Sequence, residues 1–216
     1  MKPGIWPLQR GARPARAGAA AWLALAGLCA AAHAGTVQVE VLDAAGKPVA
    51  DAVVFLDSVD ARKHVKPLAG AEIAQEKKQF VPGVLVVPVG TQVLFPNRDT
   101  VRHHVYSFSA AKKFELKLYT GTPTSPVLFD QAGVVALGCN IHDNMVGWIL
   151  VVDTPHYART PVGTGKAQID NVPAGTYTLR TWHARLPVGA PALEQSVTVP
   201  ATGTGNASVR LTGLQP

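Results

Sequence analysis

Three side chains that can bind a soft metal ion lie within seven residues of one another in the segment LGCNIHDNMVG, residues 137–147. They are Cys139, His142 and Met145, in the spacing C-x2-H-x2-M. A thiolate, an imidazole and a thioether together suit copper, because soft sulfur favours Cu(I) and nitrogen binds both oxidation states. The spacing wraps the three side chains around one tight loop, so the sequence predicts a metal site there.

A mononuclear copper site of the electron-transfer type needs a second histidine, because it combines two His and one Cys with a weak Met contact. The upstream segment FPNRDTVRHHV, residues 95–105, supplies His103 and His104 at the start of an expected strand. Adjacent residues of a regular strand point to opposite faces, so only one of the two can face the site. Periodicity alone does not decide between them.

The N-terminal segment has the pattern of a secretory signal peptide. Basic residues precede an uncharged Ala/Leu-rich run, and AHA stands before Gly35. We therefore expect residues 1–34 to be removed near Ala34 and the protein to be exported to the periplasm. The apolar run is too short and wrongly flanked for a membrane span. A lipid anchor at Cys29 is disfavoured because Leu28 fills a position where a small residue is expected.

Removal of this leader changes the charge and the cysteine content. Sixteen Lys and Arg then stand against fourteen Asp and Glu, which gives a net charge of +2 instead of +6. The remaining sequence has no basic stripe with interleaved aromatic residues, so nucleic-acid binding has no support. We also expect no stable membrane insertion after the leader is removed. Cys139 is left as the single cysteine in an oxidising compartment, where a thiol is expected to be buried, reactive or metal-bound.

Short runs rich in Val, Ile, Thr and Phe recur after the leader, separated by Gly, Pro, Asn and Asp. They predict strands in, for example, TVQVEVLD, AVVFLD, HHVYSFS, GVVALGC and GWILVVD. The pattern indicates an all-β protein, either a sandwich or a barrel. The only candidate for a helical turn is LAGAEIAQEKK, residues 68–78, which could also begin a strand.

The segments FVPGVLVVPVGTQVLFPNRDTVRHHV and LGCNIHDNMVGWILVVD resemble the cupredoxins, the small blue-copper proteins that include plastocyanin and amicyanin. The resemblance covers about residues 71–153, and the short ligand loop is similar to that of amicyanin. In that family the first His ligand follows a strand-ending Asn by six residues, which from Asn97 gives His103. The family commonly has Asn after this ligand, whereas this chain has His104, which therefore stays an alternative ligand.

This resemblance implies a fold, a cofactor and a function. It implies a Greek-key β-sandwich or barrel in which His103, Cys139, His142 and Met145 bind one type 1 copper ion. It also implies a carrier of single electrons between redox protein partners rather than an enzyme, with His142 as the place where electrons leave. Copper binding or delivery without redox turnover is the alternative, as is a metal-free interaction module.

The flanking segments suggest a second, smaller β-sandwich. DAAGKPVADAVVFL and VPAGTYTLRTWH are similar to carboxypeptidase-regulatory or transthyretin-like sandwiches, and the whole chain after the leader resembles exported cupredoxin-like proteins of the "methylamine utilization protein" type. We therefore expect residues 35–60 to pair with residues 160–214, with a copper domain of residues 70–153 inserted between them. Two short strands alone would bury too little apolar surface to be stable.

Other readings of these residues are weaker. Cys139 and His142 are poorly spaced for a nucleophile and its base in a hydrolase, and Met145 would then have no role. A structural zinc site has little use for a thioether. Asn97 and Asp99 are expected to form a turn through local backbone hydrogen bonds. His183 is expected at the surface, and Lys112, Lys113 and Lys117 on a solvated face.

Overall fold

The computed structural model of the chain describes Met1 and residues 34–215. The expected signal peptide, residues 1–34, and the disfavoured anchor Cys29 lie outside the described residues, apart from the two ends Met1 and Ala34. None of the helices in the described residues has the length and apolar character needed to cross a membrane.

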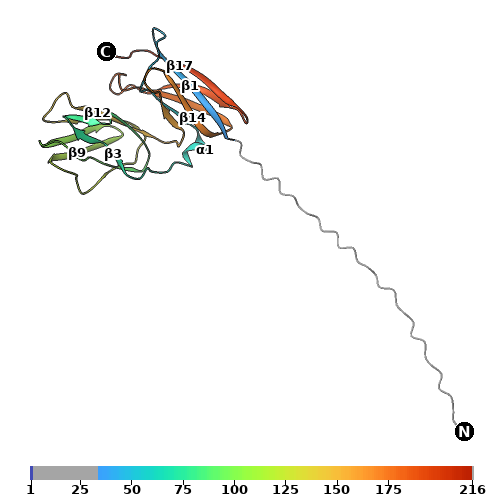
Figure 1. Cartoon of the computed structure of the whole chain (residues 1–216), viewed down its shortest axis with the longest axis horizontal. Helices are drawn as coiled ribbons and strands as arrows, with labels where there is room; N and C mark the ends of the chain where they lie inside the picture. Colours follow the sequence, from blue (N-terminus) through green and yellow to red (C-terminus); the bar gives the residue numbers. More distant parts are fainter. Residues whose placement is uncertain (2–33, 216) are drawn as a thin grey trace. The chain divides into compact units, whose positions relative to one another are not determined.

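The described residues form strands joined by short turns, with one short helix, α1 (Val59–Arg62) (Figure 1). The all-β prediction is therefore confirmed. The strands are β1 (Ala34–Asp43), β2 (Val53–Asp57), β3 (Ala71–Glu72), β4 (Ala74–Glu76), β5 (Gln79–Val81), β6 (Val84–Pro88), β7 (Thr91–Leu94), β8 (His103–Ser109), β9 (Lys112–Tyr119), β10 (Val127–Phe129), β11 (Gly133–Cys139), β12 (Val146–Val152), β13 (Tyr157–Arg159), β14 (Lys166–Pro173), β15 (Gly175–Trp182), β16 (Leu193–Val199) and β17 (Thr204–Leu211).

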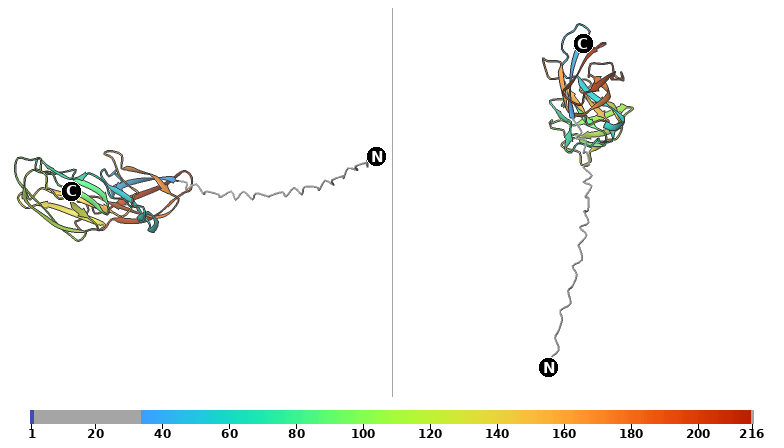
Figure 2. Two further views of the ribbon diagram at one scale, coloured as in Figure 1. Left: turned by 90° about the horizontal axis from the view of Figure 1, so that it is seen from below. Right: turned by 90° about the vertical axis from the view of Figure 1, so that its right-hand side faces the viewer.

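One sandwich is built from the first two strands and the last five. A three-stranded sheet, β14-β1-β17, and a four-stranded sheet, β13-β2-β15-β16, contribute to one apolar core. In β1 the residues Val37, Val39 and Val41 are buried in this core, while the residues between them face outward, as period-two alternation requires. β1 lies beside β17 in Figures 1 and 2, and the two strands pair in parallel.

The strands between β2 and β13 form a second set of sheets. A five-stranded sheet, β6-β12-β11-β8-β9, and a three-stranded sheet, β10-β7-β3, share a core that includes Cys139 and Met145. β4 and β5 form a separate hairpin. In β8 and β11 alternate residues are buried, so each strand turns one side toward this core.

Both sets of sheets belong to one compact unit, and a third apolar cluster contains residues of each. Phe55 of β2 and Trp182 of β15 are in this cluster together with Val86 of β6 and Leu150 of β12. The strands of residues 34–57 thus pair with strands after residue 156 and not with the sheets between. The boundaries of independently folding domains remain a prediction.

The helix lies outside residues 68–78, for which the sequence allows either a helical turn or the start of a strand. Residues 68–78 contain β3 and β4 instead, and β3 pairs in parallel with β7. The helical turn α1 begins after Ser58, whose side-chain oxygen accepts a hydrogen bond from the Ala61 backbone N–H. Such an N-cap satisfies a donor that the first turn would otherwise leave free, which explains why the turn forms there.

Candidate metal centre

Strand pairing brings Cys139 and His103 to the same place. Cys139 ends β11 opposite Val105 of β8, and His103 begins β8 two residues earlier. Residues two apart in a strand share a face, so His103 is the diagonal neighbour of Cys139. The Cys139 Sγ atom lies 3.7 Å from the Nδ1 atom of His103.

The loop after β11 brings the second imidazole to the same sulfur. Its backbone turns back on itself, because the His142 N–H donates to the Cys139 carbonyl (3.4 Å) and the Met145 N–H donates to the His142 carbonyl (2.9 Å). This turn leaves the His142 Nδ1 atom 3.8 Å from the Cys139 sulfur. The rings of His103 and His142 have centroids 5.1 Å apart.

These three side chains form a group that could hold a metal ion, since one ligand atom from each lies within 4.8 Å of the others. His103 is fully buried and Cys139 is 3% exposed, while His142 is partly exposed. Met145 is 1% exposed and packs in the same apolar core as Cys139. The donor group therefore lies at the edge of a dry core, with His142 as its side chain nearest to solvent.

His104 points away from this group, as the strand alternation requires. Its Nε2 atom lies 2.8 Å from a carboxylate oxygen of Glu115 on β9. Its ring also contacts Tyr106 edge-on, two residues along β8 on the same face. The sequence alone does not decide which of the two adjacent histidines faces the site. In the structure His103 lies beside Cys139 and His142, and His104 does not.

Asp99 contacts the far side of the His103 ring. A carboxylate oxygen of Asp99 lies 2.8 Å from His103 Nε2. An ionised carboxylate can only accept, so Nε2 carries the proton and the lone pair of Nδ1 faces the sulfur of Cys139. Asp99 thereby selects the tautomer that a metal ion at Nδ1 needs.

Asp99 also accepts hydrogen bonds from the backbone N–H groups of Lys77 (2.7 Å) and Lys78 (2.9 Å). Both lysines have a positive φ, in the two-residue turn between β4 and β5. Burial by itself would raise the pKa of Asp99, but the N–H of Lys78, the His103 ring and the N–H of Lys77 together hold this pKa below its ordinary value. The carboxylate is therefore ionised at neutral pH.

Asn97 fixes the loop that carries Asp99. Its side-chain amide donates to the carbonyls of Val101 (2.8 Å) and Tyr119 (2.9 Å), and its Oδ1 accepts from the Asp99 N–H (2.9 Å). Asn97 thus forms a turn, as the sequence indicates. The contact of Asp99 with His103 is not apparent from turn propensity, and the only sequence signal for it is the four-residue spacing between the two.

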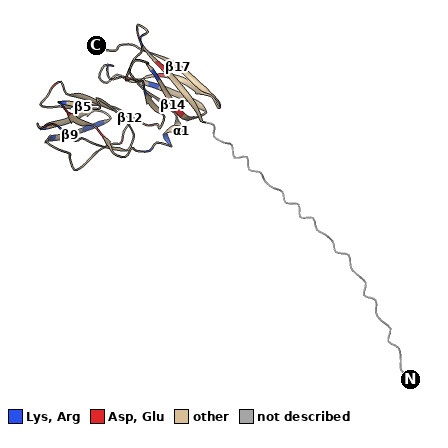
Figure 3. Ribbon diagram, viewed as in Figure 1, with Lys and Arg blue, Asp and Glu red and all other residues tan. Residues whose placement is uncertain are grey.

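His183 and the three lysines lie apart from this group. His183 is 7% exposed, so its expected surface position is wrong; its Nε2 donates to the Ala50 carbonyl and its Nδ1 accepts from the Arg185 N–H. Lys113 and Lys117 are exposed on β9, and Lys112 pairs with Asp130 (3.1 Å). Figure 3 shows Lys and Arg at several separate places on the chain, one of which is β9.

No protein-family model matches the chain. A comparison with curated proteins likewise found no match. Among solved structures, the chain is similar to a purple cupredoxin from Nitrosopumilus maritimus, with 27% identity, a TM-score of 0.32, and coverage of 38% of this chain and 99% of that one. It is also similar to the Cu(I) form of an amicyanin variant, with 24% identity, a TM-score of 0.35, and coverage of 46% and 98%. Because these TM-scores are below 0.5, no property of either protein is carried over to this chain.

Proposed function

We propose that this chain is an exported carrier of single electrons that binds one type 1 copper ion through His103, Cys139, His142 and Met145. The observation that carries the proposal is the position of the Cys139 sulfur, 3.7 and 3.8 Å from the two imidazole Nδ1 atoms. With bond lengths like those of zinc, about 2.0 Å to nitrogen and 2.3 Å to sulfur, an angle of about 120° would separate a sulfur and a nitrogen donor by about 3.7 Å. The observed sulfur–nitrogen distances therefore suit a shared metal ion without movement of the strands.

The chemistry of the donors favours copper over zinc. Two imidazoles and one thiolate in a plane, with a thioether nearby, are the ligands of a blue-copper site. Zinc sites use Cys, His and carboxylates in a tetrahedral arrangement and rarely a thioether. Met145 is the last residue of the loop, is buried in the core that contains Cys139, and supplies the fourth group in this proposal.

The chain's own residues would keep the site fixed during electron transfer. When bound, a copper ion would supply a one-electron redox couple at this place. His103 is held by Asp99 and Cys139 by its pairing in the sheet, so neither side chain has to move when the charge at the site changes. The apolar core excludes water from the sulfur, and the partly exposed ring of His142 is the proposed path for electrons.

The cellular setting is part of the same proposal. We infer export to the periplasm from the signal-peptide pattern of residues 1–34 and the single cysteine that remains after its removal. The partners would be redox proteins that approach the exposed side of His142.

The test is to load the purified protein with copper and to record its optical and electron paramagnetic resonance spectra. The proposal predicts one copper ion per chain and an intense blue charge-transfer band, which requires a thiolate bound to Cu(II). The variant Cys139→Ser should lose the band. The matched variant Met145→Leu should keep it with a changed potential, because the axial bond is weak.

The possible outcomes separate the alternatives. Copper bound without a blue band would favour copper storage or delivery, and a chain that binds no copper would favour a metal-free interaction module. A blue Cys139→Ser protein would refute the ligand assignment. Unchanged β structure in the circular dichroism spectrum of each variant shows that the change is local.

A further inference from the structure

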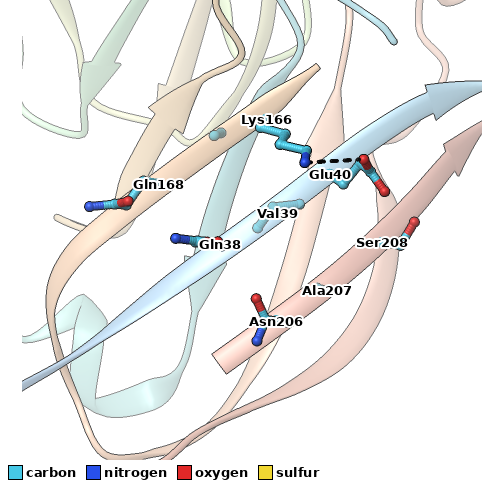
Figure 4. A pocket seen from close by; sticks show the side chains of 9 residues that line it. Gln38, Val39, Glu40, Lys166, Gln168, Asn206, Ala207 and Ser208 are labelled. Atoms are coloured by element: carbon cyan, nitrogen blue, oxygen red, sulfur yellow. Dashed lines mark ion pairs between the residues drawn. The ribbon is translucent and has the colours of Figure 1, made fainter. Parts of the chain in front are cut away.

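The outer face of the sheet β14-β1-β17 carries a row of three amide side chains around a shallow cavity of about 490 Å³ (Figure 4). Gln38 of β1 lies directly opposite Gln168 of β14 on one side and opposite Asn206 of β17 on the other. Neighbouring strands lie about 4.8 Å apart, so the three amides cross the sheet as one continuous row. We call these three residues the amide row.

A second row of polar side chains lies beside the amide row, two residues further along β1. Glu40 is opposite Lys166 of β14 and Ser208 of β17. The Lys166 Nζ and a Glu40 carboxylate oxygen are 3.8 Å apart, as the dashed line in Figure 4 marks. Because these two charges offset each other, the second row contributes polarity but no net charge.

Two of the amides make a hydrogen bond to a residue of their own strand. The Gln168 Nε2 atom donates to the carboxylate of Asp170, at 2.9 and 3.1 Å, and a carboxylate can only accept. The Asn206 Nδ2 atom donates to the Thr204 carbonyl at 3.5 Å. Each of these amides uses one of its two N–H groups in this bond and keeps its other N–H group and its carbonyl oxygen for a ligand.

The Gln38 amide in the middle of the row is free to bind a ligand. Gln38 is exposed, and in the part of the chain that the structure describes its side chain takes part in none of the hydrogen bonds. It can both donate and accept. The row thus offers three exposed amides, each of which can both donate and accept a hydrogen bond.

These features define the chemistry of a ligand. Hydroxyl groups match these amides because they also both donate and accept, whereas ionised phosphates and carboxylates can only accept. The negative charge of Asp170 beside the row also disfavours polyanions. Both rows consist of polar side chains, so an apolar protein surface or a lipid would leave their polar groups unpaired. We propose that the amide row binds a neutral, hydroxyl-rich glycan, independently of any metal at Cys139.

The test is affinity electrophoresis of the full chain in native gels that contain dextran, laminarin or galactomannan, with polygalacturonate as the polyanion. At least one neutral polysaccharide should retard the protein, and polygalacturonate should not. The triple variant Gln38→Ala/Gln168→Ala/Asn206→Ala should weaken binding about tenfold or more, because it removes three hydrogen-bonding groups. Gln92→Ala, which removes an exposed amide from β7 in another sheet, is the matched control and should bind as the parent does.

Each other result would overturn the proposal. Migration that no neutral polysaccharide changes would mean that the face is only solvated. Equal retardation of the parent and the triple variant would place any glycan site elsewhere, and binding to polygalacturonate would contradict the neutral class. All three substituted side chains are exposed, and circular dichroism with the thermal midpoint would show that the triple variant is folded. The single variant Gln38→Leu gives a second measurement with only one amide lost.

Discussion

Replacing Asp99 by asparagine should raise the reduction potential of the copper-loaded protein by roughly 100 mV. The Asp99 carboxylate lies 2.8 Å from His103 Nε2 and is only 15% exposed. Its negative charge stabilises the more positive, oxidised state of a metal at the opposite ring nitrogen. Asp99→Asn removes this charge and keeps the size of the side chain, so the reduced state should gain in relative stability.

The magnitude follows from the distance across the ring. A metal at Nδ1 would lie about 6.5 Å from the carboxylate, where a unit charge contributes about 2.5 kcal/mol at an effective dielectric constant near 20. For a one-electron couple, 59 mV corresponds to about 1.4 kcal/mol, which converts this energy to about 100 mV. The same variant should also lower the free energy of unfolding by about 1–3 kcal/mol, since one amide oxygen replaces an acceptor of three hydrogen bonds.

Protein-film voltammetry measures the potential, and urea unfolding of the metal-free chain measures the stability. Asp143→Asn is the matched control, because Asp143 is an exposed carboxylate next to His142. Water and salt screen an exposed charge, so its shift should be much smaller. A potential that falls in Asp99→Asn, or rises no more than in Asp143→Asn, would refute the reasoning.

Three further predictions concern other parts of the chain. His103→Ala should lose the blue spectrum and His104→Ala should keep it; the reverse result would show that the wrong histidine was assigned. Burial lowers the pKa of His183 in the folded chain, so below about pH 6.5 this histidine is protonated more readily in the unfolded chain than in the folded one. The free energy of unfolding should therefore fall by up to about 1.4 kcal/mol for each pH unit below that value. In His183→Gln this pH dependence of urea unfolding should be weaker, and an identical slope would contradict it. A fragment of residues 69–154 should fold and bind copper by itself, with circular dichroism and copper titration as the assays; an unfolded fragment would argue against an inserted domain.

The strands that carry the site could be predicted because they are short runs of β-favouring residues next to turn-forming residues. HHVYSFS and GVVALGC coincide with β8 and β11, and in each every second side chain is buried. β9 is not among the strands that the sequence predicts: KKFELKLY also alternates, but its lysines indicate only a solvated face. Phe114 and Leu116 between them pack against the core. A charged exposed face and a strand are two descriptions of the same pattern.

The surroundings of the site could not be predicted, because they depend on contacts between distant segments. Lysine rarely adopts a positive φ, yet both Lys77 and Lys78 do so in the β4–β5 turn. Their N–H groups bind Asp99, which is more than twenty residues away in the sequence. Local propensity contains no information about such a partner. For the same reason the sequence suggested a turn at Asp99 but not its hydrogen bond to His103.

The central position of β1 has a consequence for how the chain folds. β1 is the middle strand of its sheet, and Thr36 pairs with Thr204 of β17. The sheet therefore cannot form until a loop of about 170 residues closes, although each doubling of loop length adds only about 0.6 kcal/mol of entropy cost. The delay is kinetic, because folding slows as pairing partners become more distant in sequence. Before β17 pairs with β1, the apolar side of β1 that carries Val37, Val39 and Val41 is not yet covered by a complete core. The chain should aggregate most readily at this stage, because exposed apolar surface and unpaired strand edges promote aggregation.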